Sequence, residues 1–257
     1  MMNWNQLISA KRFGMEEFHE ERQENRSEFQ RDYDRLIFSA PFRRLQNKTQ
    51  VFPLPGSVFV HNRLTHSLEV ASVGRSLGDD VAKALLERHP ELQDSFLPEI
   101  GSIVSAACLA HDLGNPPFGH SGEKAISTFF SEGKGVRLKE KQPNGEQLSP
   151  MEWEDLTHFE GNANAFRILT HQFEGRRRGG FVLTYSTLAS IVKYPFSSSL
   201  PGTKSKFGFF VSEEESFRKI ATDLGLILLN EHPLTYARHP FVYLVEAADD
   251  ICYPIME

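Results

Sequence analysis

The clearest pattern in the chain is a long stretch of apolar positions at helical spacing over residues 64–86. Apolar residues recur there with a period of about 3.6 residues, which is typical of an amphipathic helix. They are Leu64, Leu68, Ala71, Leu77, Val81 and Leu85. His89 and Pro90 end the pattern, because a proline disfavours helical geometry at the residue before it. His66 falls on the first turn of this predicted helix.

A second helix is predicted over residues 103–110, which are nearly all apolar and are therefore expected to be buried on most sides. His111 and Asp112 follow directly, and the glycine and prolines of residues 114–117 then break the helix. A carboxylate at the end of a buried helix needs a partner. The residues alone leave two interpretations open, a metal site and a buried ion pair.

Weaker patterns elsewhere predict a mostly helical protein with one hairpin. Helices are predicted from residue 121, over 162–173, over 183–192, from 212 to about 224, and from 243 onward. Ser212 to Glu215 resembles a capping box, a helix start in which side chains and backbone bond reciprocally. Residues 52–60 combine turn formers with β-branched and aromatic residues, which predicts a short hairpin. The predicted fold class is therefore all-α with a small β-hairpin.

Two charged stretches are predicted to lie outside the core. Residues 10–36 alternate basic and acidic side chains and indicate a mostly solvated arm, from which a helix begins near Phe29 and continues toward Leu45. Residues 132–157 are rich in Gly, Pro, Gln and charges, which favours a loop or lid. We expect one domain over residues 1–257, with a charged N-terminal arm at about 1–35.

Composition narrows the class of protein. A chain of 257 residues with 40% hydrophobic content can bury a sizeable core. The net charge of -6 argues against general electrostatic binding to nucleic acid, and the triplet Arg176 to Arg178 is more simply a solvated turn. No signal segment is visible, and no run approaches the roughly 20 apolar residues that a membrane span needs. Cys108 and Cys252 lie in apolar helical patterns, so we expect two buried free thiols and a reducing cytoplasm.

Three polar intrusions into apolar helical patterns share one kind of chemistry. They are His66, the His111-Asp112 pair, and the adjacent acids Asp249 and Asp250. This succession resembles the ligand set of the HD-domain metal-dependent phosphohydrolases. The resemblance implies that His66, His111, Asp112 and Asp249 bind one metal ion. Asp250 is the rival of Asp249, but neighbours on a helix point about 100° apart, so both cannot easily reach one ion.

Further motifs narrow the resemblance to the deoxyguanosine triphosphate triphosphohydrolases (dGTPases). They are residues 42–51 (FRRLQNKTQV), the run from His111 to His120, residues 158–162 (HFEGN) and the triplet 193–195 (KYP). The matches extend from about residue 30 to the last residue. Members of this family usually continue well beyond that point, so a C-terminal part is expected to be missing from this sequence.

The turn after the His-Asp pair offers a candidate general acid or base. A histidine side chain suits general acid–base chemistry near neutral pH, and Glu123, three residues after His120, could hold its tautomer. The residues alone allow a helix-capping or surface histidine equally well. The dGTPase resemblance implies that His120 and Glu123 help to activate the attacking water, and that His158 lies near the phosphates.

The resemblance also implies residues that bind the nucleotide. Arg63, Lys193 and Tyr194 carry the donors that phosphate oxygens require, although each alone is usually a surface side chain. The matching positions in relatives contact phosphate or sugar. Gln50 and Val51 match positions that meet the base and the deoxyribose.

Two residues near the end of the chain match positions around the sugar. Tyr253 matches a tyrosine that packs near the sugar and helps to exclude a ribose 2′-hydroxyl, and its alternative is core packing. Glu257 stands where many relatives have Asp, so it keeps the acid, on a longer side chain, at a position with a sugar or phosphate role.

The donor set limits which metal ions suit the site, and the resemblance implies the reaction. Mixed imidazole and carboxylate ligands suit Mn²⁺, Fe²⁺, Co²⁺, Ni²⁺ or Mg²⁺ better than a thiolate-seeking ion. The resemblance implies hydrolysis of a deoxynucleoside triphosphate, first of all dGTP, to deoxynucleoside and triphosphate by water attack at the α-phosphorus, in a homo-oligomer. Two alternatives remain open: a phosphohydrolase for another nucleotide, and a catalytically inactive oligomer that senses nucleotides or binds single-stranded nucleic acid.

Overall fold

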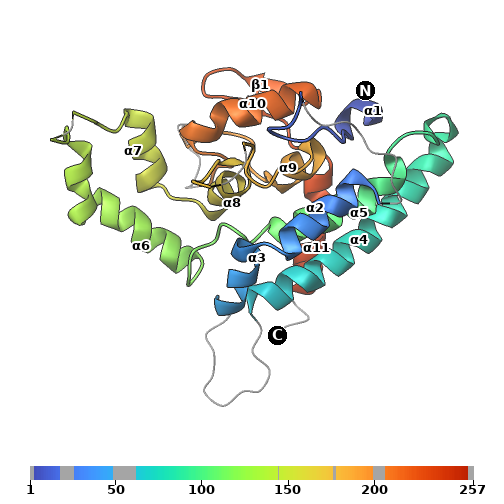
Figure 1. Cartoon of the computed structure of the whole chain (residues 1–257), viewed down its shortest axis with the longest axis horizontal. Coiled ribbons are helices and arrows are strands. Elements are labelled where there is room, and N and C mark those ends of the chain that lie inside the picture. Colours follow the sequence, from blue (N-terminus) through green and yellow to red (C-terminus); the bar gives the residue numbers. More distant parts are fainter. Residues whose placement is uncertain are drawn as a thin grey trace, which may run out of the picture.

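The computed structural model describes residues 3–17, 26–48, 62–143, 145–175, 178–198 and 206–253, and helices dominate it (Figure 1). The α-helices are α1 (Trp4–Leu7), α2 (Glu28–Ile37), α3 (Ala40–Arg44), α4 (Arg63–Arg88), α5 (Ile100–Ala110), α6 (His120–Ser131), α7 (Pro150–Thr157), α8 (Gly161–Thr170), α9 (Tyr185–Ile191), α10 (Glu214–Asp223) and α11 (Phe241–Cys252). Short 3-10 helices are η1 (Leu45–Asn47), η2 (Pro90–Leu92), η3 (Leu97–Glu99), η4 (Lys134–Lys139) and η5 (Val211–Glu213).

Helix α5 lies at the centre of the core. All its residues except Ser102 are buried, and α2, α4, α9 and α11 pack around it. Its sequence explains this position, because a helix that is apolar on all sides must be covered on all sides. The buried apolar side chains form a cluster that reaches from Ile8 to Cys252. The end of α5 therefore presents His111 and Asp112 beside α4 and α11.

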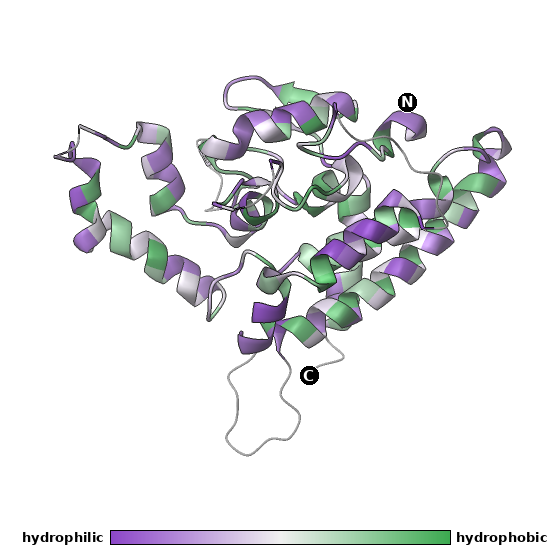
Figure 2. Cartoon of the chain, in the orientation of Figure 1, coloured by the Kyte–Doolittle hydropathy of each residue, from purple (hydrophilic) through white to green (hydrophobic). Residues whose placement is uncertain are grey.

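Helix α4 runs along α5 and confirms the helix predicted over residues 64–86. Its start is fixed by a capping box, in which Asn62 Oδ1 accepts from the Thr65 N–H and Thr65 Oγ1 accepts from the Asn62 N–H. A Cβ on Gly78 would lie 2.7 Å from Gly101 Cα, so α4 and α5 approach as closely as only glycines permit. Alternating polar and apolar segments along α4 are visible in Figure 2.

A small antiparallel sheet completes the fold. Strand β1 (Leu228–Asn230) pairs with β2 (Thr235–Tyr236), with Leu228 opposite Tyr236. The fold class of helices with a small antiparallel sheet is thus confirmed. The hairpin predicted at residues 52–60 lies outside the described residues.

The prediction of a solvated N-terminal arm is wrong for three of its charged residues. Arg12, Glu28 and Asp32 are buried, and the Arg12 guanidinium donates to both carboxylates and to the Val182 carbonyl. Asp32 Oδ2 also accepts from the Thr184 N–H at 2.9 Å and from its hydroxyl. The charges are inside because they are paired and hydrogen-bonded to one another, which a pattern of charges along the sequence does not reveal.

Other boundaries also differ from prediction. The stretch 132–157 contains η4 and α7, and α7 begins at a capping box formed by Ser149 and Glu152. The capping box predicted at Ser212 is absent, because η5 precedes α10 and its N-cap residue, Glu213, makes no side-chain cap bond. The apolar run from Phe29 is divided into α2 and α3, because Ser39 caps a new helix.

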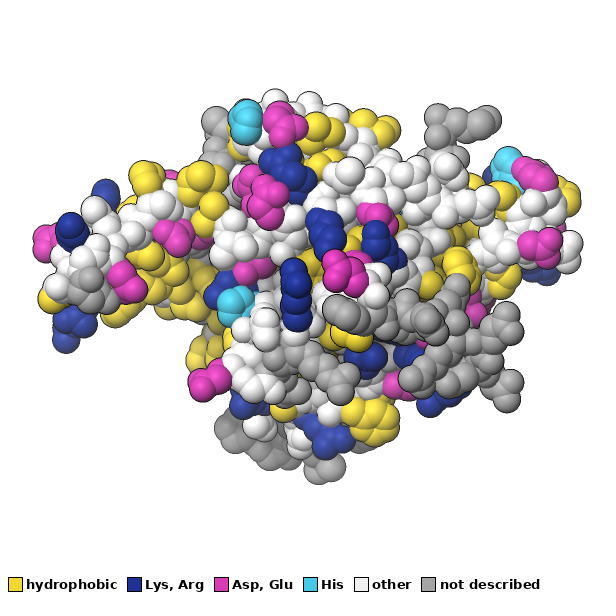
Figure 3. Space-filling model, turned by 45° about the horizontal axis from the view of Figure 1, so that its top comes forward, with side chains coloured by type: hydrophobic (Ala, Val, Ile, Leu, Met, Phe, Trp, Pro, Cys, Tyr) yellow, Lys and Arg dark blue, Asp and Glu magenta, His cyan; other side chains and the backbone are white. Residues whose placement is uncertain are grey.

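The cysteines, the lengths of the helices and the surface charges concern the chain as a whole. Cys108 and Cys252 are both buried and free, as predicted. Among the described residues, no helix combines the length and apolar character needed to cross a bilayer. On the face shown in Figure 3, acidic and basic side chains are interspersed. The single-domain organisation stays a prediction.

Candidate metal and nucleotide site

One cavity gathers most of the candidate residues. Its volume is about 320 Å³. Its walls come from the first turn of α4, the end of α5, the turn into α6, the start of α8, the end of α9, and α11. The lining includes Arg63, His66, His111, Asp112, His120, Glu123, Lys193, Tyr194, Asp249 and Tyr253. Residues that are distant in sequence therefore share one hollow.

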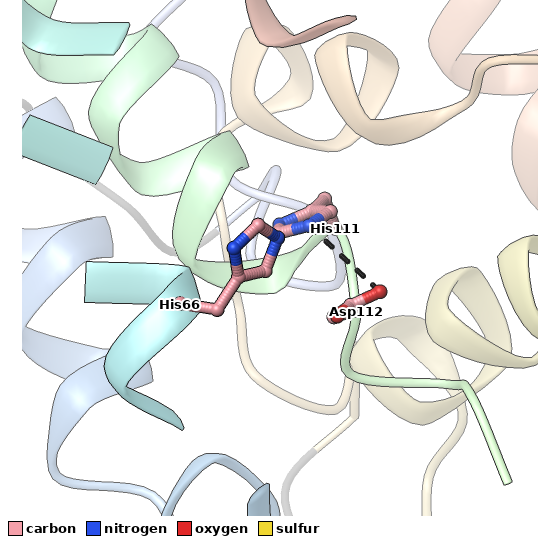
Figure 4. Close-up of side chains that lie close together, drawn as sticks. All are labelled: His66, His111 and Asp112. Atoms are coloured by element: carbon pink, nitrogen blue, oxygen red, sulfur yellow. Dashed lines mark ion pairs between the residues drawn. The ribbon is translucent and has the colours of Figure 1, made fainter. Parts of the chain in front are cut away.

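Three of the four predicted metal ligands form a compact group (Figure 4). His66, His111 and Asp112 each offer a ligand atom, and these atoms all lie within 4.8 Å of one another. His66 projects from the first turn of α4, while His111 and Asp112 lie directly after α5. The His66 and His111 rings meet edge to face, with centroids 5.4 Å apart.

Asp249, which lies on α11, is the fourth predicted ligand and lies beside the two histidines. Its Oδ1 lies 2.9 Å from His66 Nε2 and 3.6 Å from His111 Nε2. Burial favours a raised pKa, but the hydrogen bond from His66 and the charges of His111 and Lys193 outweigh it, so the pKa of Asp249 is lowered. Asp250 is exposed and does not line the cavity. This arrangement favours Asp249 over its neighbour.

The hydrogen bonds around the histidines suit a cation. His111 Nδ1 lies 2.6 Å from the Cys108 carbonyl oxygen, so Nδ1 carries the proton and Nε2 keeps its lone pair. Within the described part of the chain, the buried Nδ1 of His66 has no hydrogen-bond partner. Two imidazole nitrogens and two carboxylates thus converge, and this donor set fits a divalent ion of the borderline or hard kind.

Asp112 is held from its other side. Arg63 Nη1 donates to Asp112 Oδ2 at 2.6 Å, and Asn115 Nδ2 donates to Oδ1 at 2.5 Å. Asn115 is in turn placed by Lys48, whose Nζ donates to the Asn115 carbonyl at 2.7 Å. Burial, together with the charge of Arg63, lowers the pKa of Lys48. Arg63 is therefore both a neighbour of the ligands and a cation in the cavity wall.

A strained turn returns the chain to the cavity after the His-Asp pair. Phe118 has φ of 66° and Gly119 has φ of 53°, both in the left-handed region that side chains rarely adopt. His120 follows as the first residue of α6, with its side chain 85% exposed. Strain of this kind needs support from the surrounding structure and gathers at functional sites.

His120 and Glu123 interact as the sequence predicts. Their Nδ1 and Oε2 atoms lie 2.8 Å apart, and the second oxygen of Glu123 accepts from the Gly161 N–H at 2.9 Å. Glu123 is therefore fixed by α8 while it orients His120. This contact leaves the Nε2 of His120 free for proton transfer.

The structure brings some nucleotide residues together and leaves others apart. Lys193 Nζ lies 2.8 Å from Glu246 Oε1 and 5.8 Å from the centre of the Tyr194 ring. Tyr253 lines the cavity with 57% of its surface exposed, so its side chain is not packed in the core.

His158 is exposed, bonds to the Glu154 carbonyl and does not line the cavity. The structure thus gives no support for a role of His158 at the phosphates. Gln50, Val51 and Glu257 lie outside the described residues.

Sequence reasoning missed a buried acid and its partner lysine. Glu160 is 1% exposed, and its Oε1 lies 2.9 Å from Lys206 Nζ and 3.0 Å from Asn162 Nδ2. Burial raises the pKa of Glu160, although the bonds from Asn162 and Lys206 oppose the shift. All three residues line the cavity. One signal for Lys206 was available, because it directly precedes an aromatic run whose Phe207 and Phe209 are buried anchors.

Comparison with known proteins finds a matching domain and similar chains. Residues 63–178 match the model of the HD domain. The whole chain is 46% identical to a deoxyguanosinetriphosphate triphosphohydrolase-like protein of Synechocystis sp., of which it covers 59%, and 46% identical to one of Pseudomonas aeruginosa, of which it covers 56%. It is 36% identical to a deoxyguanosinetriphosphate triphosphohydrolase of Yersinia enterocolitica, of which it covers 54%.

The chain spans between about half and three fifths of the length of these curated relatives. The matched HD domain begins at Arg63, ahead of His66, and includes His111, Asp112, His120 and Glu123. An HD domain implies a divalent metal ion, with which the cluster of His66, His111 and Asp112 is compatible. The resemblance seen in the motifs is confirmed: residues 63–178 match the HD domain, and the chain is similar along its whole length to proteins named deoxyguanosinetriphosphate triphosphohydrolase or triphosphohydrolase-like.

Proposed function

We propose that the protein hydrolyses deoxynucleoside triphosphates, with dGTP as the leading substrate, to deoxynucleoside and inorganic triphosphate. The observation that carries the proposal is the convergence of a His/Asp ligand set, a His120–Glu123 pair and several cations on one cavity. The names of the relatives support the substrate class. The two free thiols support a reducing cytoplasm as the location.

In this proposal His66, His111, Asp112 and Asp249 hold one divalent ion, of which Mn²⁺, Mg²⁺, Fe²⁺, Co²⁺ and Ni²⁺ all suit the donors. When bound, the ion supplies positive charge against the phosphate oxygens and Lewis-acid polarisation. Arg63, Lys193 and Tyr194 add donors from the cavity wall, and Lys206 joins them as a cation that the sequence did not single out.

The proton transfers belong to His120. With Nδ1 bonded to Glu123, its Nε2 can accept a proton from the attacking water. The water oxygen forms a bond to the α-phosphorus, and the bond from this phosphorus to the 5′-oxygen breaks. The 5′-oxygen takes up a proton and leaves as the deoxynucleoside, while all three phosphorus atoms depart together as triphosphate.

Tyr253 is proposed to select against ribonucleotides by occupying the space beside C2′. An added hydroxyl there loses hydrogen bonds or displaces the ring, at a cost of about 1 to 3 kcal/mol. This corresponds to a rate ratio of roughly 5 to 150. Tyr253 is more than half exposed, so its ring is accessible to the sugar of a bound nucleotide.

The test is to incubate the purified protein with each of the four dNTPs and with GTP, in Mn²⁺ or Mg²⁺, and to resolve the products by ion-exchange chromatography. We expect deoxyguanosine and triphosphate from dGTP, and slower turnover of GTP. Release of pyrophosphate or monophosphate would indicate a phosphohydrolase with another point of attack. No turnover with any of these nucleotides would favour an inactive nucleotide-binding protein.

A further inference from the structure

Glu246 presents a carboxylate to the cavity in which the triphosphate is proposed to bind. It lies on α11 three residues before Asp249, so the two acids project from the same side of this helix into the cavity. Asp249 lies beside the histidines of the proposed metal site, whereas both oxygens of Glu246 are bound by cations of the chain itself. A carboxylate repels phosphate, so these contacts indicate a task for Glu246 other than binding the substrate directly.

The two oxygens of Glu246 bind two different cations. Its Oε1 lies 2.8 Å from Lys193 Nζ, and its Oε2 accepts from Arg238 Nη1 at 3.0 Å. Two positive charges therefore meet one negative charge, so the group keeps a net positive charge. Burial favours a lowered pKa for Lys193, but the hydrogen bond to Glu246 and the neighbouring charges outweigh it, so the pKa of Lys193 is raised.

The ring of Tyr194 lies beside the same two cations. Its centre is 5.8 Å from Lys193 Nζ and 5.7 Å from the guanidinium carbon of Arg238. At this distance a cation is attracted by the electrons of an aromatic ring. The Arg238 guanidinium also lies 5.7 Å from the ring centre of Tyr243, which belongs to α11. Two rings and one carboxylate thus restrict the orientation of the guanidinium more than an ion pair alone would.

The backbone brings Arg238 to Tyr194 from a distant part of the chain. Pro195, next to Tyr194, accepts through its carbonyl from the Tyr236 N–H at 2.9 Å, and Arg238 follows two residues later. A Cβ on Gly208 would lie 2.1 Å from the Tyr194 carbonyl oxygen, so a third segment packs closely on this turn. Tyr194 lines the cavity, whereas Arg238 does not. Arg238 therefore acts on a bound ligand through the residues that it contacts.

From these contacts we propose that Glu246 and Arg238 are positioning residues for the polyphosphate of a bound nucleotide. They hold the Lys193 ammonium and the Tyr194 ring in the places from which these groups meet phosphate oxygens. An ammonium has three donors, so Lys193 can bind Glu246 and still donate to phosphate. The nature of the ligand, a polyphosphate, rests here on the proposed function. Neither positioning residue takes part in the chemical step, so their effect is on affinity.

A charge effect and a positioning effect predict opposite results for Glu246→Gln. If Glu246 acted only through its charge, this variant would make the cavity more positive and strengthen phosphate binding. If Glu246 positions Lys193, binding weakens, because a bond between two charged groups is stronger than a bond to a neutral amide. Arg238→Lys separates the same two effects, since it keeps the charge but loses the planar guanidinium that packs against the rings.

Isothermal titration calorimetry with inorganic triphosphate as the probe, in Mg²⁺, measures this affinity directly. We expect Glu246→Gln and Arg238→Lys each to raise the dissociation constant by about tenfold. The metal content and the circular dichroism spectrum should stay as in the wild type. The control is Arg218→Lys, because Arg218 also pairs with an acid, Glu231, but lies outside the cavity lining. Unchanged or tighter binding to Glu246→Gln would overturn the inference, and so would equal weakening by the control.

Steady-state kinetics with dGTP test the same two residues on the reaction. We expect Glu246→Gln and Arg238→Lys to raise KM by about tenfold and to change kcat by less than about twofold, because they remove binding that the ground state and the transition state share. A fall in kcat with unchanged KM would contradict a positioning role. A wild type that binds triphosphate in the predicted manner but hydrolyses no nucleotide contradicts the proposed function alone. A wild type that does not bind triphosphate overturns the inference.

Discussion

Asp112 combines two tasks, since it faces the two histidines and also accepts from Arg63 and Asn115. Replacing it with alanine removes one proposed ligand and leaves Arg63 without its carboxylate partner. We predict that Asp112→Ala loses the bound metal, as measured by elemental analysis of the purified protein. The matched control is Asp250→Ala, an exposed acid of α11 that does not line the cavity, and this variant should retain the metal. Full occupancy in Asp112→Ala would remove the central element of the site.

His120 is proposed to transfer protons without binding the ion. His120→Ala should therefore keep the metal and lose about 10²- to 10⁴-fold in turnover, the usual contribution of a general acid or base. His158→Ala is the control, because His158 is also an exposed histidine but lies away from the cavity lining. If both variants turn over at the wild-type rate, His120 has a structural role only.

At the residue scale, the sequence predicted the groups that stand out against an apolar background. His66, His111, Asp112 and Asp249 interrupt helices that are otherwise buried, so their positions carry a signal. Glu160 and Lys206 carry none of comparable strength, because they lie 46 residues apart and meet only after folding. No periodicity links such a pair. His158 is the converse case, because a matching motif predicts a role for it at the phosphates but it does not line the cavity.

At the scale of single elements, α7 is anchored to the rest of the molecule through Asp155. Its carboxylate accepts from Ser198 Oγ at 2.6 Å and from the Val211 N–H at 2.7 Å. Burial raises its pKa to about 6 from 3.8, although these hydrogen bonds oppose the shift. The folded protein therefore holds this proton more tightly than the unfolded chain does.

The stability contributed by this proton is fully present below about pH 4 and is lost as the pH rises to 6. The shift corresponds to about 3 kcal/mol of unfolding free energy. Asp155→Asn cannot ionise, so between pH 4 and 7 its stability relative to the wild type should increase by about this amount. Loss of the carboxylate as a hydrogen-bond acceptor also changes the unfolding free energy of the variant, but by an amount that does not depend on pH. Urea unfolding at several pH values measures the change, with the exposed Glu154→Gln as control, and parallel curves for Asp155→Asn and wild type would contradict the prediction.

Among the elements, the long periodic helices could be predicted and the short ones could not. The apolar pattern of α4 spans many turns, and α5 is apolar almost throughout. Packing in the core therefore favours the same helices that the local sequence pattern predicts. Helix α7 is short, and among the described residues of 120–157 no hydrophobic side chain is buried. Its sequence therefore resembles a loop. Only the Ser149–Glu152 capping box marked its start, and a similar pattern at Ser212 proved misleading.

For the whole molecule, Arg12 links the N-terminal segment to α2 and to the stretch before α9. Replacing it with methionine would remove the cation that both carboxylates share, so that Glu28 keeps its contact with Arg31 while the fully buried Asp32 loses its bond to Arg12. Breaking a buried ion pair in this way costs about 3 to 5 kcal/mol. We therefore predict a large loss of unfolding free energy for Arg12→Met in urea denaturation.

The neighbouring residue provides the control for Arg12. Lys11 Nζ pairs with Asp223 at 2.7 Å, but both side chains are partly exposed. Lys11→Met should therefore cost only about 0 to 1 kcal/mol. Similar losses for Lys11→Met and Arg12→Met would show that the buried network is not what holds the segment.

The same network has a consequence for the order in which the molecule is completed during synthesis. Arg12 leaves the ribosome 170 residues before Val182, whose carbonyl it must bond, and Asp32 precedes Thr184 by 152 residues. Chains are made from the N-terminus onward, and early segments can fold before later ones exist. Here Arg12 can pair with Glu28, 16 residues later, but the bonds to Val182 and Thr184 cannot form until the stretch before α9 has been made. The beginning of the chain is therefore among the last parts of the core to be fixed in place.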